Sequence, residues 1–564
     1  MAKFKTQSGV ALAVALGSGC YVGHPDASDL AVGGTEFADS NDDDGTGGGV
    51  AEDDGPPDET GDDGPGGGDS PDDGDDGADD GAPSDDDGVP QDDGGTDDGT
   101  LPPPGDLASG IAFTDVQLNQ GVVIEIVREG TVLSAAQRNA DIIDGRAALV
   151  RGLFVTDGGF APRTLEGRLI IRNGDASEAF SDVRQVNGDA DASELEGGFL
   201  WEVPTGAIGA DAEFSLEILE TDDTIDGASA EGGARVPVDG TTSLQTASGE
   251  HTLRIVIVPL AYGNLSPDLS AANKETLEAA LYEQNPVTDL DISYRELTDY
   301  PFAVNNGNQL GDVLGFLGNL KSQDGAGNEV YYAGVINIGC FVVGCGNAGT
   351  TGIGYIPSAQ SFASTQRVSA NVWFNAESSS QTVVHETGHN QGLNHVACPQ
   401  ASSSGVDPAY PYGNGQVGGW GWGALSGEFH GSNSYDYMSY CGPSWVSDWT
   451  WSKTQSRIEA LSSQAAPPSG GALLGHLYPD GTQTWFQTGV PADSSVGTSG
   501  VTIALQRDGK TEQVVPAAEG QLSEDGGRWV LAPLPTGLDF DAFELRDSGE
   551  IHTIDAGKIR FSTR

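Results

Sequence analysis

The chain has little positive charge. Its 564 residues include 25 Lys and Arg against 85 Asp and Glu, which gives a formal net charge of -60. A surface of this sign repels phosphate, so the composition excludes a nucleic-acid partner. The imbalance is greatest in residues 21–108, which hold 29 acidic residues and no Lys or Arg. This stretch therefore differs in kind from the rest of the chain.

Aromatic residues are absent between Ala38 and Ala112, where Asp-Asp-Gly units alternate with prolines. Such a stretch cannot bury enough apolar surface to offset the entropy lost on ordering, so we expect a disordered acidic tether over 20–108. Aspartate clusters can also bind Ca²⁺. The ordered ligand spacing and closing Glu of a calcium loop are missing, however, and the pattern gives Ca²⁺ no support.

The chain also lacks an apolar run of the roughly 18 residues that a transmembrane helix needs. The shorter apolar run Val10–Leu16 follows two lysines, which predicts a signal peptide over 1–19. Cys20 ends a sequence that resembles a bacterial lipoprotein box, although Gly17 stands where that pattern prefers Leu. The resemblance implies a lipidated Cys20 and attachment to the outer membrane or cell surface, with plain secretion as the alternative.

Cysteine is scarce, and the five residues are Cys20, Cys340, Cys345, Cys398 and Cys441. If Cys20 is lipidated, four cysteines remain, which permits two disulfides in an oxidising compartment. The alternative is four unpaired, buried thiols.

Hydrophobic patterning divides the remaining chain into three segments. Residues 109–250 show the alternation typical of strands and predict a β-sandwich-like domain. Residues 251–465 mix strand and helix patterns, with a helix expected over Ala271–Gln284, and predict an α+β (mixed α/β) domain. Short strands and Asp-Gly turns over 466–564 predict a small C-terminal β domain. The predicted fold class is an α+β domain flanked by two all-β domains.

Three of the eight histidines lie within eleven residues, in the run His385-Glu386-Thr387-Gly388-His389-Asn390-Gln391-Gly392-Leu393-Asn394-His395. On a helix, His385 and His389 lie one turn apart on the same face, so both can bind one metal ion. We expect this helix to begin at an N-cap among Ser378–Ser380. We expect Gly392 to end it in the left-handed conformation, so that His395 returns as a third ligand.

Three neutral imidazoles leave one position of a tetrahedral Zn²⁺ open to water, which is the arrangement of a catalytic rather than a structural zinc site. Glu386 directly follows the first histidine. It is the candidate general base, which accepts a proton from that water and passes it to the leaving amine. The motif therefore predicts one catalytic Zn²⁺ ion and hydrolysis of peptide bonds.

The motif resembles the signature of the metzincin clan of zinc endopeptidases, in which a methionine-containing turn follows the histidines. The one methionine besides Met1 is Met438, in the run Tyr435-Asp436-Tyr437-Met438-Ser439-Tyr440-Cys441. The resemblance implies a metzincin-like catalytic domain with Met438 as a hydrophobic floor beneath the histidines. It also implies that Tyr440 is a movable ligand and oxyanion stabiliser, with a plain core tyrosine as the alternative.

The run from Cys441 to Trp449 is similar to bacterial secreted metzincins related to the mucin-cleaving enterobacterial protease. Val396 stands where astacins, adamalysins and matrixins have Asp or Ser, so the chain does not follow those branches. In the resembled fold, a strand such as Arg367–Phe374 is an edge strand that pairs with the substrate peptide. Trp445 and Trp449 then either line a substrate pocket or fill the core.

The same resemblance gives the cysteines an interpretation. A Cys398–Cys441 disulfide would join the third histidine to the methionine turn, and Cys340 and Cys345 would then pair across a short loop. No cysteine in 109–250 could block the zinc as a thiolate. That leaves open an aspartate or another inhibitory arrangement, so the segment is either a propeptide-like domain or a permanent accessory.

The sequence predicts an exported, zinc-dependent endopeptidase that acts on extracellular proteins or glycoproteins, either at the cell surface as a lipoprotein or as a secreted enzyme. The alternative is a catalytically silent surface adhesin or glycoprotein-binding protein on a metzincin scaffold. Such proteins commonly lose the general base, whereas Glu386 is present here.

Overall fold

The computed structural model describes residues 105–561 apart from short gaps, which are 223, 230–231, 305–306, 340–349, 358–365, 400–404, 463–470, 489–499, 525 and 536. The predicted signal peptide, most of the predicted tether, the lipidation site Cys20 and the predicted pair Cys340 and Cys345 lie outside the described residues. Within the described part, no helix combines the length and the apolar character needed to cross a membrane.

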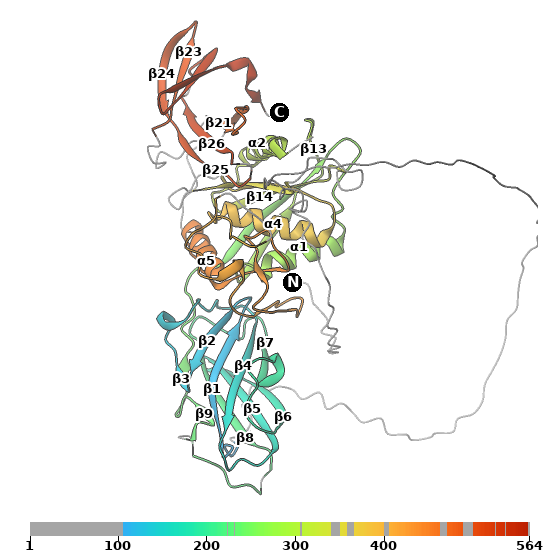
Figure 1. Cartoon of the computed structure of the whole chain (residues 1–564), viewed down its shortest axis with the longest axis vertical. Helices are drawn as coiled ribbons and strands as arrows, with labels where there is room; N and C mark the ends of the chain where they lie inside the picture. The colour runs from blue at the N-terminus through green and yellow to red at the C-terminus, as the bar shows by residue number, and fades with distance from the viewer. Residues whose placement is uncertain are drawn as a thin grey trace, which may run out of the picture. The chain divides into compact units, whose positions relative to one another are not determined.

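Two β-sheets form the first part of the described chain (Figure 1). Their strand orders are β3-β2-β1-β4-β7 and β10-β8-β5-β6, with β9 paired to β8. Phe113, Trp201 and Phe214 come from both sheets and are buried in one core. The strands are β1 Ile111–Asn119, β2 Val123–Arg128, β3 Thr131–Val132, β4 Ala148–Thr156, β5 Arg163–Asn173, β6 Ala176–Val186, β7 Phe199–Val203, β8 Glu213–Glu220, β9 Arg235–Val236 and β10 Thr242–Ser243.

The middle of the chain builds the sheet β12-β11-β14-β16-β15, in which β15 is antiparallel to β16 and the other neighbours are parallel. Helices α1 and α4 pack together on one face of this sheet and α2 covers the other (Figure 1). The elements are β11 Thr252–Ala261, α1 Ala271–Glu283, β12 Asp289–Tyr294, β13 Thr298–Asp299, α2 Gly307–Gln323, β14 Val330–Ile336, β15 Gly352–Ile356, β16 Val368–Val372, α4 Ala376–Asn390, β17 Gly421–Trp422, β18 Phe429–His430, β19 Tyr435–Asp436, β20 Ser444–Trp445 and α5 Asp448–Ser462.

The predicted edge strand Arg367–Phe374 is wrong in its position. Its core, β16, lies between β14 and β15, so both of its edges are already paired. The outer strand of this part of the sheet is β15, which precedes β16 in the chain but lies beyond it in space.

The C-terminal strands continue the same sheet, because β25 pairs with β15. The order from there is β25-β26-β21-β22-β29, and a second sheet has the order β24-β23-β27-β28. Leu473, Trp485 and Phe543 are buried between the two sheets. The strands are β21 Gly471–Leu477, β22 Gln483–Thr488, β23 Thr502–Arg507, β24 Lys510–Pro516, β25 Ala518–Leu522, β26 Arg528–Leu534, β27 Ala542–Asp547, β28 Glu550–Asp555 and β29 Arg560–Phe561.

The described residues are therefore mostly β, with four α-helices. This composition is compatible with the expected α+β domain flanked by β-rich segments. The β15–β25 contact has the larger consequence, since it brings a distant part of the chain to the end of the sheet that carries the histidine helix.

Candidate metal centre

Helix α4 carries the histidine motif and begins at Ala376. Its N-cap is Asn375, whose side-chain oxygen accepts a hydrogen bond from the Ser378 amide at 2.9 Å. The predicted N-cap among Ser378–Ser380 is therefore wrong. These serines lie inside the helix, because Asn375, three residues after the end of β16, caps it earlier.

The three predicted histidine ligands come together. The Nε2 atom of His389 lies 3.0 Å from Nε2 of His385 and 3.1 Å from Nε2 of His395. All three residues are buried. The spacing of the motif on α4 and the return of the chain after it therefore aim three imidazole nitrogens at one point.

Two backbone carbonyls fix the orientation of these rings. Tyr437 O lies 2.6 Å from Nδ1 of His385, and Leu393 O lies 2.8 Å from Nδ1 of His389. A carbonyl oxygen can only accept, so both Nδ1 atoms carry the proton and both Nε2 atoms present lone pairs. Lone pairs about 3 Å apart repel one another unless a cation lies among them. The donor set thus fits a metal ion.

Burial also keeps these imidazoles neutral. It lowers the pKa of His385 to about 4, and it holds the pKa of His389 well below its usual value. Neutral imidazole is the form that binds metal, so no proton has to be removed from either ring at neutral pH.

The turn after α4 depends on Gly392. Its φ is +93°, in the left-handed region that a side chain disfavours. The Gly392 amide donates to His389 O at 2.8 Å, which ends the helix where the sequence predicted. The chain then turns back and brings His395 to the other two histidines.

Met438 lies beneath the motif helix. A Cβ atom added to Gly388 would lie 2.5 Å from its sulfur, so the thioether packs on the helix between the first two histidines. The Met438 carbonyl accepts from the Val396 amide at 2.8 Å, and its amide donates to Asp436 Oδ1 at 2.8 Å. The same turn supplies the Tyr437 carbonyl that orients the His385 ring. It therefore positions a candidate metal ligand as well as packing beneath the helix.

The predicted Cys398–Cys441 disulfide is confirmed, with a Cα–Cα distance of 6.2 Å. It joins the segment after His395 to the segment after Met438. Closing a loop of 43 residues stabilises the fold by about 4 kcal/mol in the chain-entropy view.

Glu386 is buried beside β15. Its Oε2 accepts a hydrogen bond from the Ser523 hydroxyl at 3.0 Å. A Cβ atom on Gly352 would lie 2.6 Å from its Oε1, so this glycine leaves room for the carboxylate. Burial raises the pKa of Glu386 well above its usual value, and the nearby charge of Glu524 raises it further. A carboxyl with a raised pKa takes up a proton more readily than an ordinary glutamate.

Tyr440 and Glu524 lie beside His395. The Tyr440 hydroxyl is 2.8 Å from Nε2 of His395 and donates to Glu524 Oε1 at 2.5 Å. Glu524 Oε1 is itself 3.3 Å from Nε2 of His395. One donor atom each from the three histidines and Glu524 lie within 4.8 Å of one another. Sequence reasoning missed Ser523 and Glu524, which belong to no motif and reach the site through the pairing of β25 with β15.

The two tryptophans after the methionine turn differ in their surroundings. Trp445 is buried, stacks on His430 with ring centroids 3.6 Å apart, and donates to Gly121 O at 2.7 Å. Trp445 therefore fills the core and does not line a substrate pocket, which was the other interpretation. Trp449 is partly exposed and has the Lys453 ammonium 4.6 Å from the centre of its ring.

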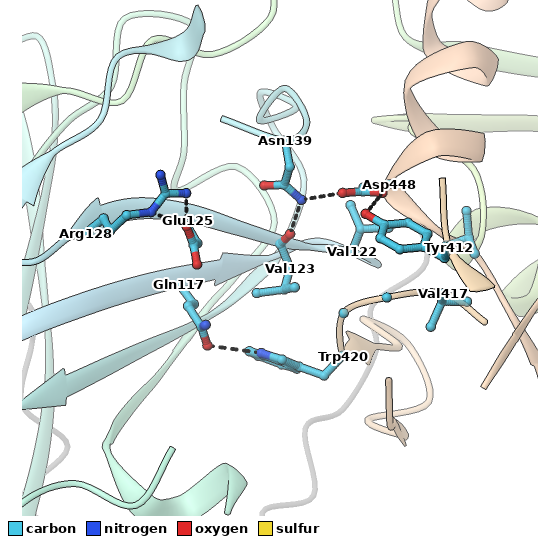
Figure 2. Close-up of a pocket in the computed structure, with 13 residues that line it drawn as sticks. Gln117, Val122, Val123, Glu125, Arg128, Asn139, Tyr412, Val417, Trp420 and Asp448 are labelled. Atoms are coloured by element: carbon cyan, nitrogen blue, oxygen red, sulfur yellow. Dashed lines mark hydrogen bonds and ion pairs between the residues drawn. The ribbon is translucent and has the colours of Figure 1, made fainter. Parts of the chain in front are cut away.

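A separate cavity of about 240 Å³ lies between the first β-sheets and the methionine-turn region (Figure 2). Its polar groups satisfy one another. Asp448 accepts from the Tyr412 hydroxyl at 2.7 Å and from the Asn139 amide at 2.9 Å, and the Trp420 indole donates to Gln117 at 3.1 Å. None of the histidine ligands lines this cavity. It is a seam between two parts of the chain, called the Asp448 seam below.

Two family models match the chain. The model described as Peptidase M66 matches residues 368–464, and the model described as Metallo-peptidase family M12B Reprolysin-like matches residues 280–396. The matched stretches together contain the three histidines, Glu386 and the methionine turn. A search of curated proteins found no match.

Similar solved structures include one described as a chaperone-substrate complex, at 14% identity and a TM-score of 0.22, covering 47% of this chain and 38% of that one. This chain thus spans well under half of that protein. Another is metalloproteinase-II from Bacteroides fragilis, at 11% identity and a TM-score of 0.22, covering 57% of this chain and 85% of that one.

Proposed function

Because residues 280–464 carry a metzincin-type zinc metallopeptidase domain, we propose that the chain is an exported zinc endopeptidase that cleaves extracellular proteins or glycoproteins. The observation that carries the proposal is the convergence of three imidazole Nε2 atoms beside a buried glutamate. Export is supported by the signal-like segment at the N-terminus and by the Cys398–Cys441 disulfide, which fits an oxidising compartment.

The side chains have distinct roles in this proposal. A Zn²⁺ ion held by the three histidines would polarise the scissile carbonyl and acidify a water molecule. Glu386 takes the proton of the attacking water on its carboxylate and returns it to the leaving amine. The Tyr440 hydroxyl donates a hydrogen bond to the oxygen that gains negative charge. The Tyr437 and Leu393 carbonyls keep two of the rings in the tautomer that binds metal.

The test compares Glu386→Gln with Glu377→Gln, which removes an exposed carboxylate from the first turn of the same helix. Both variants should retain one zinc ion per chain, since the three histidines are intact. We expect Glu386→Gln to lose at least a thousandfold in the rate of hydrolysis of an unfolded protein, and Glu377→Gln to match the parent chain. Turnover that survives in Glu386→Gln would remove this residue from its role.

A silent glycoprotein-binding protein would behave differently in the same experiment. The parent chain would then bind a glycoprotein, release no fragments at any enzyme concentration, and bind equally well after zinc removal. The buried Glu386 beside the ligand cluster favours the enzyme.

A further inference from the structure

Glu524 stands where a fourth metal ligand would stand. Its carboxylate belongs to the group of four donors that lie within 4.8 Å of one another, and it is 3.3 Å from Nε2 of His395. Zinc sites with four protein ligands are closed, whereas a catalytic site keeps one position for water. The described chain therefore offers a complete set of ligands rather than an open one.

The residues just before Glu524 cover β15 at the edge of the sheet β12-β11-β14-β16-β15, called the catalytic sheet below. Ser523 donates its amide to Gly354 O at 2.9 Å, and its hydroxyl oxygen accepts from the Gly354 amide at 2.8 Å. The next two residues of β15, Tyr355 and Ile356, pair with β25. An extended peptide that is to be cut beside Glu386 would bind by adding to such an edge. That edge is occupied by the chain itself.

The same turn also engages both side chains to which we assign chemistry. The Ser523 hydroxyl donates to Glu386, and Glu524 accepts from the hydroxyl of Tyr440. Two successive residues thus contact the metal-ligand cluster, the candidate base, the candidate oxyanion donor and the strand edge.

We propose that this structure is a latent form, in which Glu524 is the fourth metal ligand and Gln521–Ser523 occupies the binding edge for the substrate backbone. The proposal rests on the proposed function, since it assigns the regulation of the same site. Hydrolysis requires Gln521–Ser523 to leave the strand edge and Glu524 to leave the metal ligands.

The strand pairing allows this movement. Strand β25 pairs with β15 over two residue pairs, but with β26 over four, and β26 pairs with β21 over seven. Glu524 lies in the turn after β25, with 17% of its side chain exposed. The turn can therefore separate from β15 while β26 and β21 keep their pairing.

The test measures access to the metal without turnover. The full chain is loaded with Co²⁺ and titrated with acetohydroxamate, a small chelating anion, while the visible absorption of the cobalt is followed. Glu524→Ala should bind acetohydroxamate at least tenfold more tightly than the parent chain. The matched control is Glu519→Ala, which removes a carboxylate of the same strand that pairs with Arg528, away from the site. It should behave as the parent does, and equal affinities in all three proteins would overturn the proposal.

Glu524→Gln is a second variant for the case that Glu524→Ala fails to fold. Its amide keeps the shape of the side chain and still accepts a hydrogen bond from Tyr440. It should bind acetohydroxamate more tightly than the Glu519→Ala control, since a neutral amide is a weaker ligand than a carboxylate. If it binds no more tightly than the control, Glu524 does not close the site.

The zinc-loaded proteins separate latency from direct participation in the reaction. We expect Glu524→Ala to hydrolyse an unfolded protein at least tenfold faster than the parent chain. A slower rate would make Glu524 part of the catalytic machinery and would overturn latency. Repeating the cobalt titration with Glu386→Gln added to each variant removes turnover from the readout. If acetohydroxamate discriminates there while no variant cleaves protein, the closed site stands and the proposed function fails.

Discussion

The two β-rich regions on either side of the catalytic sheet contact different parts of it. The first, over residues 111–243, holds the end of helix α1. Arg146 is fully buried there, and its guanidinium donates five hydrogen bonds to backbone carbonyls, namely those of Gln120, Tyr282, Glu283, Asn285 and Val287. The C-terminal region places Ser523 and Glu524 within the candidate site instead.

This difference bears on how the enzyme would be kept inactive. The sequence left open whether 109–250 is a removable propeptide-like domain. A buried arginine that satisfies the carbonyl end of α1 argues for a permanent part of the folded body, because its removal would leave those carbonyls without partners. The segment that contacts the ligands is the short turn after β25. We therefore expect the first β region to stabilise the fold and the turn after β25 to restrain the site.

The largest effect we expect comes from Arg146→Met. The variant loses the five hydrogen bonds and leaves buried carbonyls unpaired, which should lower the free energy of unfolding by about 3–5 kcal/mol. Urea unfolding followed by tryptophan fluorescence measures the loss. The matched change is Arg528→Met in the C-terminal region, where the side chain is 36% exposed and pairs with Glu519 and Asp547. That loss should stay below about 1 kcal/mol. Equal losses would remove the contrast between the two regions.

Acid should act on the C-terminal region through His476. The ring is fully buried, its Nε2 is 2.8 Å from the Tyr355 hydroxyl, and burial lowers its pKa to about 3. The unfolded chain binds this proton near pH 6.5 and the folded chain does not. The free energy of unfolding should therefore fall as the pH falls from about 6.5 toward 3, by about 3 kcal/mol at pH 4.

His476→Gln keeps a partner for Tyr355 and should lessen this dependence by the share that His476 contributes, as measured by urea midpoints at successive pH values. The control is His552→Gln, on a half-exposed side chain of β28. It should leave the pH profile of the parent chain unchanged. An identical slope in both variants would show that the acid sensitivity arises elsewhere.

A smaller effect is expected at Ser523. Ser523→Ala removes one hydrogen bond to Glu386 and one from the Gly354 amide, each worth about 1 kcal/mol. Because both bonds exist in the closed form, the rate of protein hydrolysis should rise by up to about thirtyfold. Ser548→Ala, at an exposed turn between β27 and β28, is the control and should not change the rate. A fall in rate for Ser523→Ala would indicate that the serine assists Glu386 rather than restraining it.

The sequence predicted the local half of the candidate site. His385, His389 and Gly392 are related by helical spacing and by one helix end, which depend on a few adjacent residues. Their meeting with Met438 could be inferred only through a resemblance, because Met438 follows them by 46 to 53 positions. The order of strands in the sheet is not a local property. The sequence therefore placed the edge at β16, whereas β15 lies outside it and is covered by β25.

Ser523 and Glu524 mark the limit of such prediction. Nothing in their neighbourhood distinguishes them from other polar turn residues, since their role depends on a strand pairing between residues more than 150 positions apart. The prediction of the N-cap of α4 was wrong for a related reason. Asn375 and the three serines are all good caps, and the choice among them depends on where β16 ends.

The smallest effect is expected at the Asp448 seam (Figure 2). Asn139 donates there to Asp448 at 2.9 Å and to Val123 O at 2.8 Å, but it is exposed, and the Tyr412 hydroxyl remains on Asp448 when it is removed. Water can replace both bonds, so Asn139→Ala should lower the free energy of unfolding by less than about 1 kcal/mol. The rate of hydrolysis should not change, because the seam holds none of the ligands. A change in rate without a change in the urea midpoint would mean that the first β region also acts on the site, and the division of roles would then fail.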